Sequence, residues 1–139
     1  MRRDRERGSA LLLVPAGFLV LLILASITFD YSHLYLAKRE LTATAEAAAQ
    51  DAVTAGVDQA RLRAGDGVHL DQHLVDDALE QALAAHGRDL HILSARAILI
   101  SDTQVQVELV ATISYVFVRA FPGAARDATI TVRASADAV

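Results

Sequence analysis

The chain has 139 residues, which is room for one domain, and 53% of them are hydrophobic. It contains no cysteine, so disulfides, thiolate metal sites and cysteine nucleophiles are excluded. From Glu40 onward it holds fourteen acidic and seven basic residues, a balance that argues against nucleic acid as a partner because no basic patch could neutralise phosphates.

The first predicted element is a transmembrane helix over residues 9–30, with Ser9 as its N-cap. Within it, twenty consecutive residues lack a charge, and thirteen of them are Leu, Ile, Val or Phe. Twenty helical residues at about 1.5 Å each match a bilayer core of about 30 Å. Four arginines in residues 1–8, against Lys38 and Arg39 beyond the span, place this N-terminal tail in the cytoplasm by the positive-inside rule.

A cleaved secretory signal is the alternative interpretation of the apolar run. The basic segment before the run is typical of a signal. However, the run is long for one, and Ala25-Ser26-Ile27 is its nearest approach to a small-x-small cleavage site. We therefore expect the anchor to be retained.

The helix is predicted to continue outside the membrane over residues 31–55, which contain no Pro or Gly. One face has apolar residues at spacings of seven, four, three and four: Leu34, Leu41, Ala45, Ala48 and Ala52. Such small residues let another helix approach closely, although alanine is also the best helix former. We expect this face to pair with partner helices.

Asp30 ends the apolar run at its outer side. One interpretation is a solvated boundary residue that stops the span. The other is a pairing residue that holds a Lys, an Arg or an N-terminal amine of a partner helix, as charges in membrane helices tend to do.

Residues 56–139 are predicted to form a small α+β extracytoplasmic domain. Three glycines between residues 56 and 67 mark a break, and an amphipathic helix over residues 71–86 follows. Asp71 is its expected N-cap and Gly87 its terminator, and Leu70 with Val75 forms a hydrophobic staple.

After this helix the apolar period changes to two, which predicts three strands at residues 90–100, 105–117 and 130–136. Ile92, Ile98 and Ile100 are expected on one face of the first strand, and Tyr115 and Phe117 on the apolar face of the second. Phe121-Pro122-Gly123 is expected to end the second strand. The predicted fold is α+β: a long N-terminal transmembrane helix (about residues 9–55), then a helix packed on a three-stranded, mainly antiparallel sheet.

The polar residues do not predict chemistry. His69 and His73 are four apart, but the former precedes the helix cap and no third ligand is placed. Asp76 and Asp77 point about 100° apart on a helix and do not converge on one substrate. There is no Gly-rich phosphate loop and no serine in a nucleophile elbow. We expect no enzyme activity, no cofactor and no metal site.

The N-terminal segment resembles a known family. Arg7-Gly8-Ser9-Ala10 leads into an apolar span with Pro15. The segment from Phe29-Asp30-Tyr31 to Lys38-Arg39-Glu40-Leu41 follows, and then Ala45-Glu46-Ala47-Ala48. This pattern, over roughly residues 7–55, is similar to that of the TadE/TadG-like proteins of tight-adherence (Flp) pilus systems.

The resemblance implies a pilin-like architecture and a minor pilin or pilus-assembly component. It implies a processing junction at Gly8 and Ser9, a helix kink at Pro15 and helix pairing at Asp30. Cleavage after Gly8 would put Leu13 at the fifth position, where prepilin-type substrates carry Glu, so the sequence leans toward an anchored protein.

Our leading hypothesis is a non-enzymatic subunit of a Flp-type pilus or related secretion system. Its expected partners are other pilin-like subunits, contacted through the N-terminal helix, and the bacterial cell membrane. The alternatives are a single-pass membrane-anchored binding or sensor module, which an exposed aromatic pocket would favour, and a secreted domain with a cleaved signal.

Overall fold

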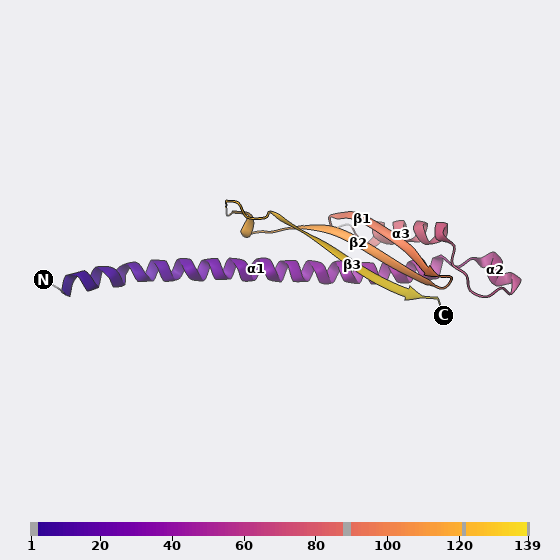
Figure 1. Ribbon diagram of the computed structural model, residues 1–139, viewed down its shortest axis with the longest axis horizontal. Helices are drawn as coiled ribbons and strands as arrows, with labels where there is room; N and C mark the ends of the chain where they lie inside the picture. Colours follow the sequence, from indigo (N-terminus) through magenta and orange to yellow (C-terminus); the bar gives the residue numbers. More distant parts are fainter. Residues whose placement is uncertain (1–2, 88–89, 121, 139) are drawn as a thin grey trace.

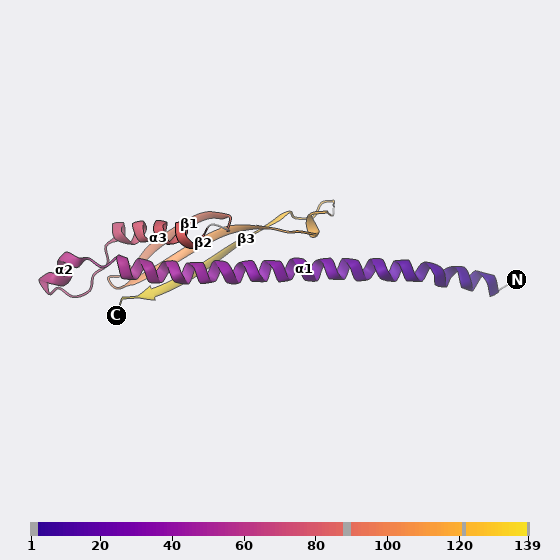
Figure 2. The same cartoon turned by 180° about the vertical axis from the view of Figure 1, so that it is seen from behind.

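The computed structural model describes residues 3–87, 90–120 and 122–138, with the side chains of the long helix described from Leu13 on. Helix α1 (Arg3–Ala55) is one continuous helix, and Figures 1 and 2 show the N-terminus at one end of the long axis and the C-terminus toward the other. The predicted end of this helix is confirmed. Its start is earlier than expected because the residues before Gly8 are largely good helix formers, so Ser9 is not the N-cap.

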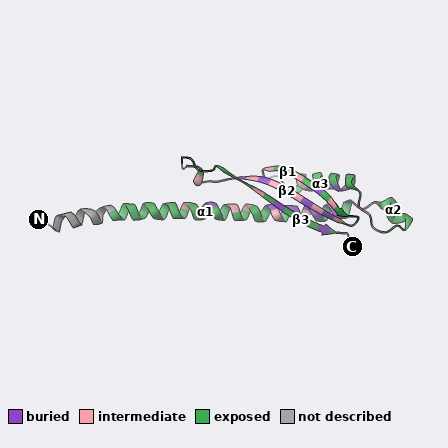
Figure 3. Ribbon diagram, in the orientation of Figure 1, coloured by how far each residue is buried: buried purple, intermediate pink, exposed green. Residues whose placement is uncertain are grey.

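From Leu13 to Phe29, helix α1 is apolar and largely exposed. Among the described residues it contains the one helix segment that is long and apolar enough to cross a membrane. The polar side chains of this segment form hydrogen bonds within the helix. The Ser26 and Thr28 hydroxyls donate to the carbonyls of Leu22 and Leu24, at 2.7 and 2.9 Å. Figure 3 shows the described part of this segment as exposed, and the buried residues of α1 gathered mainly in the second half of the helix.

Helix α1 ends where Gly56 meets the rest of the chain. A Cβ at this position would collide with the Ala52 carbonyl and with the Val75 side chain, so glycine permits a close approach. The expected break then contains a short helix, α2 (Gln59–Ala64). The Asp58 carboxylate caps it by accepting from the amides of Ala60 and Arg61.

Helix α3 (Gln72–His86) forms as predicted, with Asp71 as its N-cap. The Asp71 carboxylate accepts from the amides of His73 and Leu74, at 2.8 and 3.3 Å. Both members of the predicted staple, Leu70 and Val75, are buried. Gly87 ends the helix with a bond from its amide to the Leu83 carbonyl, with a negative φ rather than a left-handed one.

The sheet has three antiparallel strands in the order β1-β2-β3: β1 (Ile92–Ser101), β2 (Gln104–Ser114) and β3 (Asp127–Asp137). The central strand β2 buries alternate residues from Val105 to Ile113, as the sequence predicts. It ends at Ser114, however, before Tyr115 and Phe117. The predicted end at Phe121-Pro122-Gly123 is therefore too late, and Phe121 itself lies outside the described residues.

The predicted face of β1 is wrong. Ile98 and Ile100 are exposed, whereas Ala97 is buried and Ala95 and Leu99 pack against the core. The pairing of β1 with β2 is irregular between Ile92 and Ser94. Such a bulge shifts the alternation by one residue, so the side chains beyond it change face.

The core lies between one face of the sheet and two helices, and the predicted α+β fold class is confirmed. Helix α1 packs against β2 and β3, helix α3 packs against β1, and the two helices contact each other. Figures 1 and 2 show α3 running back alongside the end of α1, and the β2–β3 connection reaching toward the N-terminal half of α1. We call the part of the chain from α2 to β3 the head.

Candidate functional site

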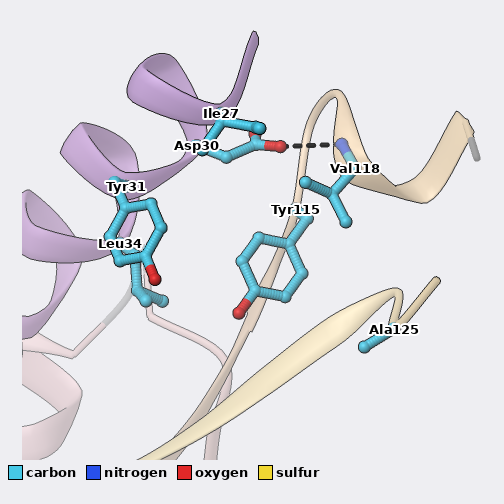
Figure 4. Close-up of a pocket in the computed structure, with 7 residues that line it drawn as sticks. All are labelled: Ile27, Asp30, Tyr31, Leu34, Tyr115, Val118 and Ala125. Atoms are coloured by element: carbon cyan, nitrogen blue, oxygen red, sulfur yellow. Dashed lines mark hydrogen bonds between the residues drawn. The ribbon is translucent and has the colours of Figure 1, made fainter. Parts of the chain in front are cut away.

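Asp30 joins the long helix to the head. Its side chain is 2% exposed, and among the described residues it is the one charged side chain that is buried. One carboxylate oxygen accepts from the amides of Val116 and Phe117, at 2.9 and 3.1 Å, and the other from those of Phe117 and Val118, at 3.1 and 2.7 Å. Figure 4 shows the bond to Val118 bridging helix and head. We call this set of bonds the Asp30 contact.

The three amides are free for Asp30 because the sheet ends just before them. The Tyr115 amide makes a last bond to the Arg126 carbonyl, and the chain then turns into a short 3-10 helix, η1 (Val118–Ala120). The first amides of a helix lack intrahelical acceptors, and a carboxylate is a strong acceptor for them. The local chain therefore presents a cluster of donors that needs an acid.

An aromatic pair accompanies these hydrogen bonds. The rings of Phe29 and Phe117 meet edge to face, with centroids 5.2 Å apart and planes at 88°. Phe117 takes part in both contacts: its ring packs on Phe29, and its amide donates to the carboxylate of Asp30, the next residue of α1. The two contacts therefore hold the β2–β3 connection to the same turn of the helix. The β2–β3 connection is thereby held at Phe29, the last residue of the apolar run, and at Asp30, which follows it.

A pocket of about 230 Å³ opens beside the Asp30 contact. Its lining comes from one face of α1 and from the β2–β3 connection: Ile27, Asp30, Tyr31, Leu34, Tyr115, Val118 and Ala125. Figure 4 shows the Tyr31 and Tyr115 side chains on opposite sides of it. The lining is mainly apolar, and its one carboxylate is already taken up by backbone amides. This arrangement can bind an apolar group or fix two elements, but it presents no pair of groups for acid–base chemistry.

The alanine face of α1 lies against the chain's own head. Leu41, Ala45, Ala48 and Ala52 are all buried there and belong to the hydrophobic core with Val107 and Leu109. Leu34 is half-buried and lines the pocket. Both Asp30 and this face thus have partners within the chain.

The structure does not bring the other predicted site residues into this site. Gly8 and Ser9 lie in the first turns of α1, with side chains outside the description, and Pro15 lies within the helix. Phe117, expected in the core, is partly exposed and packs on Phe29. Sequence reasoning did not anticipate the amides of residues 116–118, because backbone donors leave no signature in residue types.

The architecture is consistent with a membrane-anchored protein that carries a small head on a single apolar helix. A family model described as Tad, putative Flp pilus-assembly TadE/G-like, matches residues 8–64. This match confirms the resemblance drawn from the sequence. It covers α1 from Gly8, including Asp30, and ends at the close of α2, before the sheet. No curated protein and no solved structure matches the chain.

Proposed function

We propose that the chain is a non-enzymatic, minor pilin-like or assembly subunit of a Flp-type pilus. Residues 9–30 span the membrane, residues 1–8 lie in the cytoplasm, and the head lies outside, packed on residues 31–55. The observation that carries the proposal is the division of α1 into an uncovered apolar half and a half buried by the head. The family match over residues 8–64 supports the same role.

In this proposal, lateral contacts with other subunits form along the uncovered part of α1. Asp30 and the alanine face both contact the head of the same chain. These contacts favour a role in fixing the head against α1. Pairing of these residues with partner helices stays a prediction. Unchanged piliation and unchanged co-purification of pilus subunits in an Asp30→Ala strain would show that Asp30 does not pair with a partner helix.

The decisive experiment combines the mature N-terminus with a charge placed in the span. A mature protein that starts at Met1 indicates an anchored assembly subunit, and one that starts at Ser9 indicates a processed pilin-like subunit. A start near Ile27 would show that the span is a cleaved signal and would overturn the proposal. The forms that start at Met1 and at Ser9 both retain residues 9–30, so the proposed membrane span is the same in both.

The second arm uses Leu19→Arg with Leu22→Arg, since each arginine near the centre of a span costs about 2.5–3.5 kcal/mol of insertion free energy. Two of them together offset the several kcal/mol that the apolar residues of the span contribute. We expect the variant to leave the membrane fraction and to abolish pilus formation. Leu62→Arg, an exposed leucine of α2, is the matched control and should leave both unchanged. Normal membrane retention of the double variant would contradict the predicted span.

The pocket beside Asp30 favours the alternative of an anchored binding module only weakly. It is aromatic-lined, but its volume of about 230 Å³ lies below the range of about 300–1,000 Å³ usual for small-molecule sites. A subunit role therefore accounts better for the structure.

A further inference from the structure

The β2–β3 connection differs in charge from the rest of the head. We call residues 115–120 and 122–126 the tip. Along the sequence from residue 115 to 126 there are two arginines, Arg119 and Arg126, and no acid, whereas the remainder of the chain from Glu40 holds fourteen acids and five arginines. Both tip arginines are exposed. The tip is thus a small cationic end on an acidic head, and it is bordered by Asp127, which lines one hollow together with both tip arginines.

The tip also exposes apolar side chains. Val116 is 42% exposed and Phe117 is 43% exposed. Pro122 and Ala125 are exposed as well. Exposed apolar residues with flanking arginines suit a membrane surface, where apolar side chains reach the acyl boundary and cations meet anionic headgroups.

The Asp30 contact sets the height of the tip relative to the apolar span. Twenty helical residues from Ala10 to Phe29 rise about 30 Å, the thickness of the bilayer core. Residue 30 therefore falls at the boundary between hydrocarbon and headgroups. Val116, Phe117 and Val118 are hydrogen-bonded to that residue, so the tip is held at the same boundary.

The helix carries the matching signature at this level. Tyr31 and Tyr35 are one helical turn apart and strongly exposed, and Tyr31 lines the pocket that also contacts the tip. Tyrosines are enriched at membrane–water interfaces because their rings are apolar and their hydroxyls are wet. Helix and tip together present aromatic and cationic groups at one level.

We propose that the tip docks into the interfacial layer of the membrane that α1 crosses. Val116 and Phe117 enter the boundary of the acyl chains, and Arg119 and Arg126 bind anionic lipid phosphates. This inference rests on the proposed membrane span. A second copy of the chain fits less well, because at this level it would present its own cationic tip, and two like-charged tips repel. Docking at two points, helix and tip, would fix the tilt of the head on the membrane.

The absence of cysteine makes a direct test possible. The full-length chain is reconstituted in vesicles of phosphatidylcholine with phosphatidylglycerol, with a single fluorescent label at Val116→Cys and spin-labelled lipids as quenchers. Leu22→Cys reports the span, and Asp66→Cys, on the exposed loop after α2, reports the distal end of the head. We expect quenching at positions 22 and 116 and none at position 66.

The outcomes separate this inference from the proposed function. Quenching at position 22 without quenching at position 116 would overturn tip docking and leave the spanning helix intact. No quenching at either position would overturn both. An unquenched position 116 that forms disulfides between copies would show that the tip meets a second subunit instead, and would also overturn the inference.

A second set of variants tests whether the tip arginines bind anionic lipid. Arg119→Gln with Arg126→Gln, in the labelled Val116→Cys chain, should reduce quenching severalfold in vesicles that contain phosphatidylglycerol. The same pair should have little effect in phosphatidylcholine alone. Arg61→Gln with Arg63→Gln, two exposed arginines on α2, is the matched control and should change nothing. Equal quenching with and without the tip arginines in the anionic vesicles would overturn their assignment to lipid phosphates.

Discussion

Asp30 places a carboxylate at the end of an apolar run, where a buried charge needs compensating hydrogen bonds. The sequence identifies this residue as unusual and offers a solvated boundary or a partner helix as explanations. The structure supplies a different group of donors, the amides of residues 116–118, which lie 86 to 88 positions away in the sequence. No periodicity or spacing links Asp30 to them, because any residue type has a backbone amide.

Removal of the Asp30 carboxylate should loosen the tip and leave the core folded. In Asp30→Ala, the amides of Val116, Phe117 and Val118 lose their acceptor, so we expect their hydrogen-exchange protection to fall by about tenfold or more. Asp30→Asn keeps one acceptor oxygen and should show a smaller loss.

Hydrogen exchange followed by mass spectrometry, on the full-length chain in detergent, measures this effect. Glu46→Gln, an exposed acid on the same helix, is the control and should leave the exchange of residues 116–118 unchanged. Unaltered protection of these amides in Asp30→Ala would show that the contact does not order the tip.

At the scale of elements, the sequence predicts most of the fold. The uncharged run and the following alanine-rich stretch give one helix that ends at Ala55, and Asp71 and Gly87 bracket α3. The strict alternation from Val105 to Ile113 gives the central strand. These features are local, so residue order alone is enough to identify them.

The face of β1 is not local in this sense. A single irregularity near Ser94 reverses which residues point inward, and its position depends on pairing with Val110 and Ala111 of β2. The larger isoleucines also favour the wrong face in a prediction from sequence. In the structure, helix α3 packs against β1, and the inward positions next to it hold Ala97 and Ala95. Close helix packing therefore overrides the preference for burying the bulkiest side chains.

A pair of charge substitutions distinguishes the two possible faces. Ala97→Asp puts a carboxylate into the buried face and should destabilise the head by about 3 kcal/mol or more. Ile98→Asp, on the neighbouring and 39% exposed side chain, should cost about 1 kcal/mol or less. Chemical denaturation monitored by circular dichroism gives both values. The reverse order of stabilities would mean that the predicted face of β1 was right after all.

At the scale of the whole molecule, two lengths match. From Asp30 to Ala55 the helix rises about 38 Å, and the eleven residues of β2 span about 36 Å. Strand β2 starts beside the C-terminal end of α1 and runs back along the helix. Its far end, where the β2–β3 connection begins, therefore lies at the level of Asp30. The element lengths in the sequence carry this signal, although it becomes readable only once the strands are known to run along the helix.

The burial of the alanine face bears on where the folding unit begins. Leu41, Ala45, Ala48 and Ala52 sit in the core between α3 and the sheet, so the head has no complete core without them. Residues 56–139, taken as a domain by sequence reasoning, include only one side of this core. We propose that the cooperative unit extends back to Asp30, whose carboxylate holds the far end of the β2–β3 hairpin.

Two truncations test this boundary. A chain of residues 28–139 retains the Phe29 and Asp30 contacts and lacks most of the exposed apolar half of α1, so we expect it to be water-soluble and to unfold cooperatively. A chain of residues 56–139 exposes the inner face of the sheet and should remain unfolded or aggregate. Thermal melts by circular dichroism and amide dispersion in NMR spectra measure the difference. As a control, a peptide of residues 28–55 added to residues 56–139 should restore the folded spectrum, because it supplies the missing side of the core. A cooperative melt of residues 56–139 alone would show instead that α1 is an anchor attached to a head that folds without it.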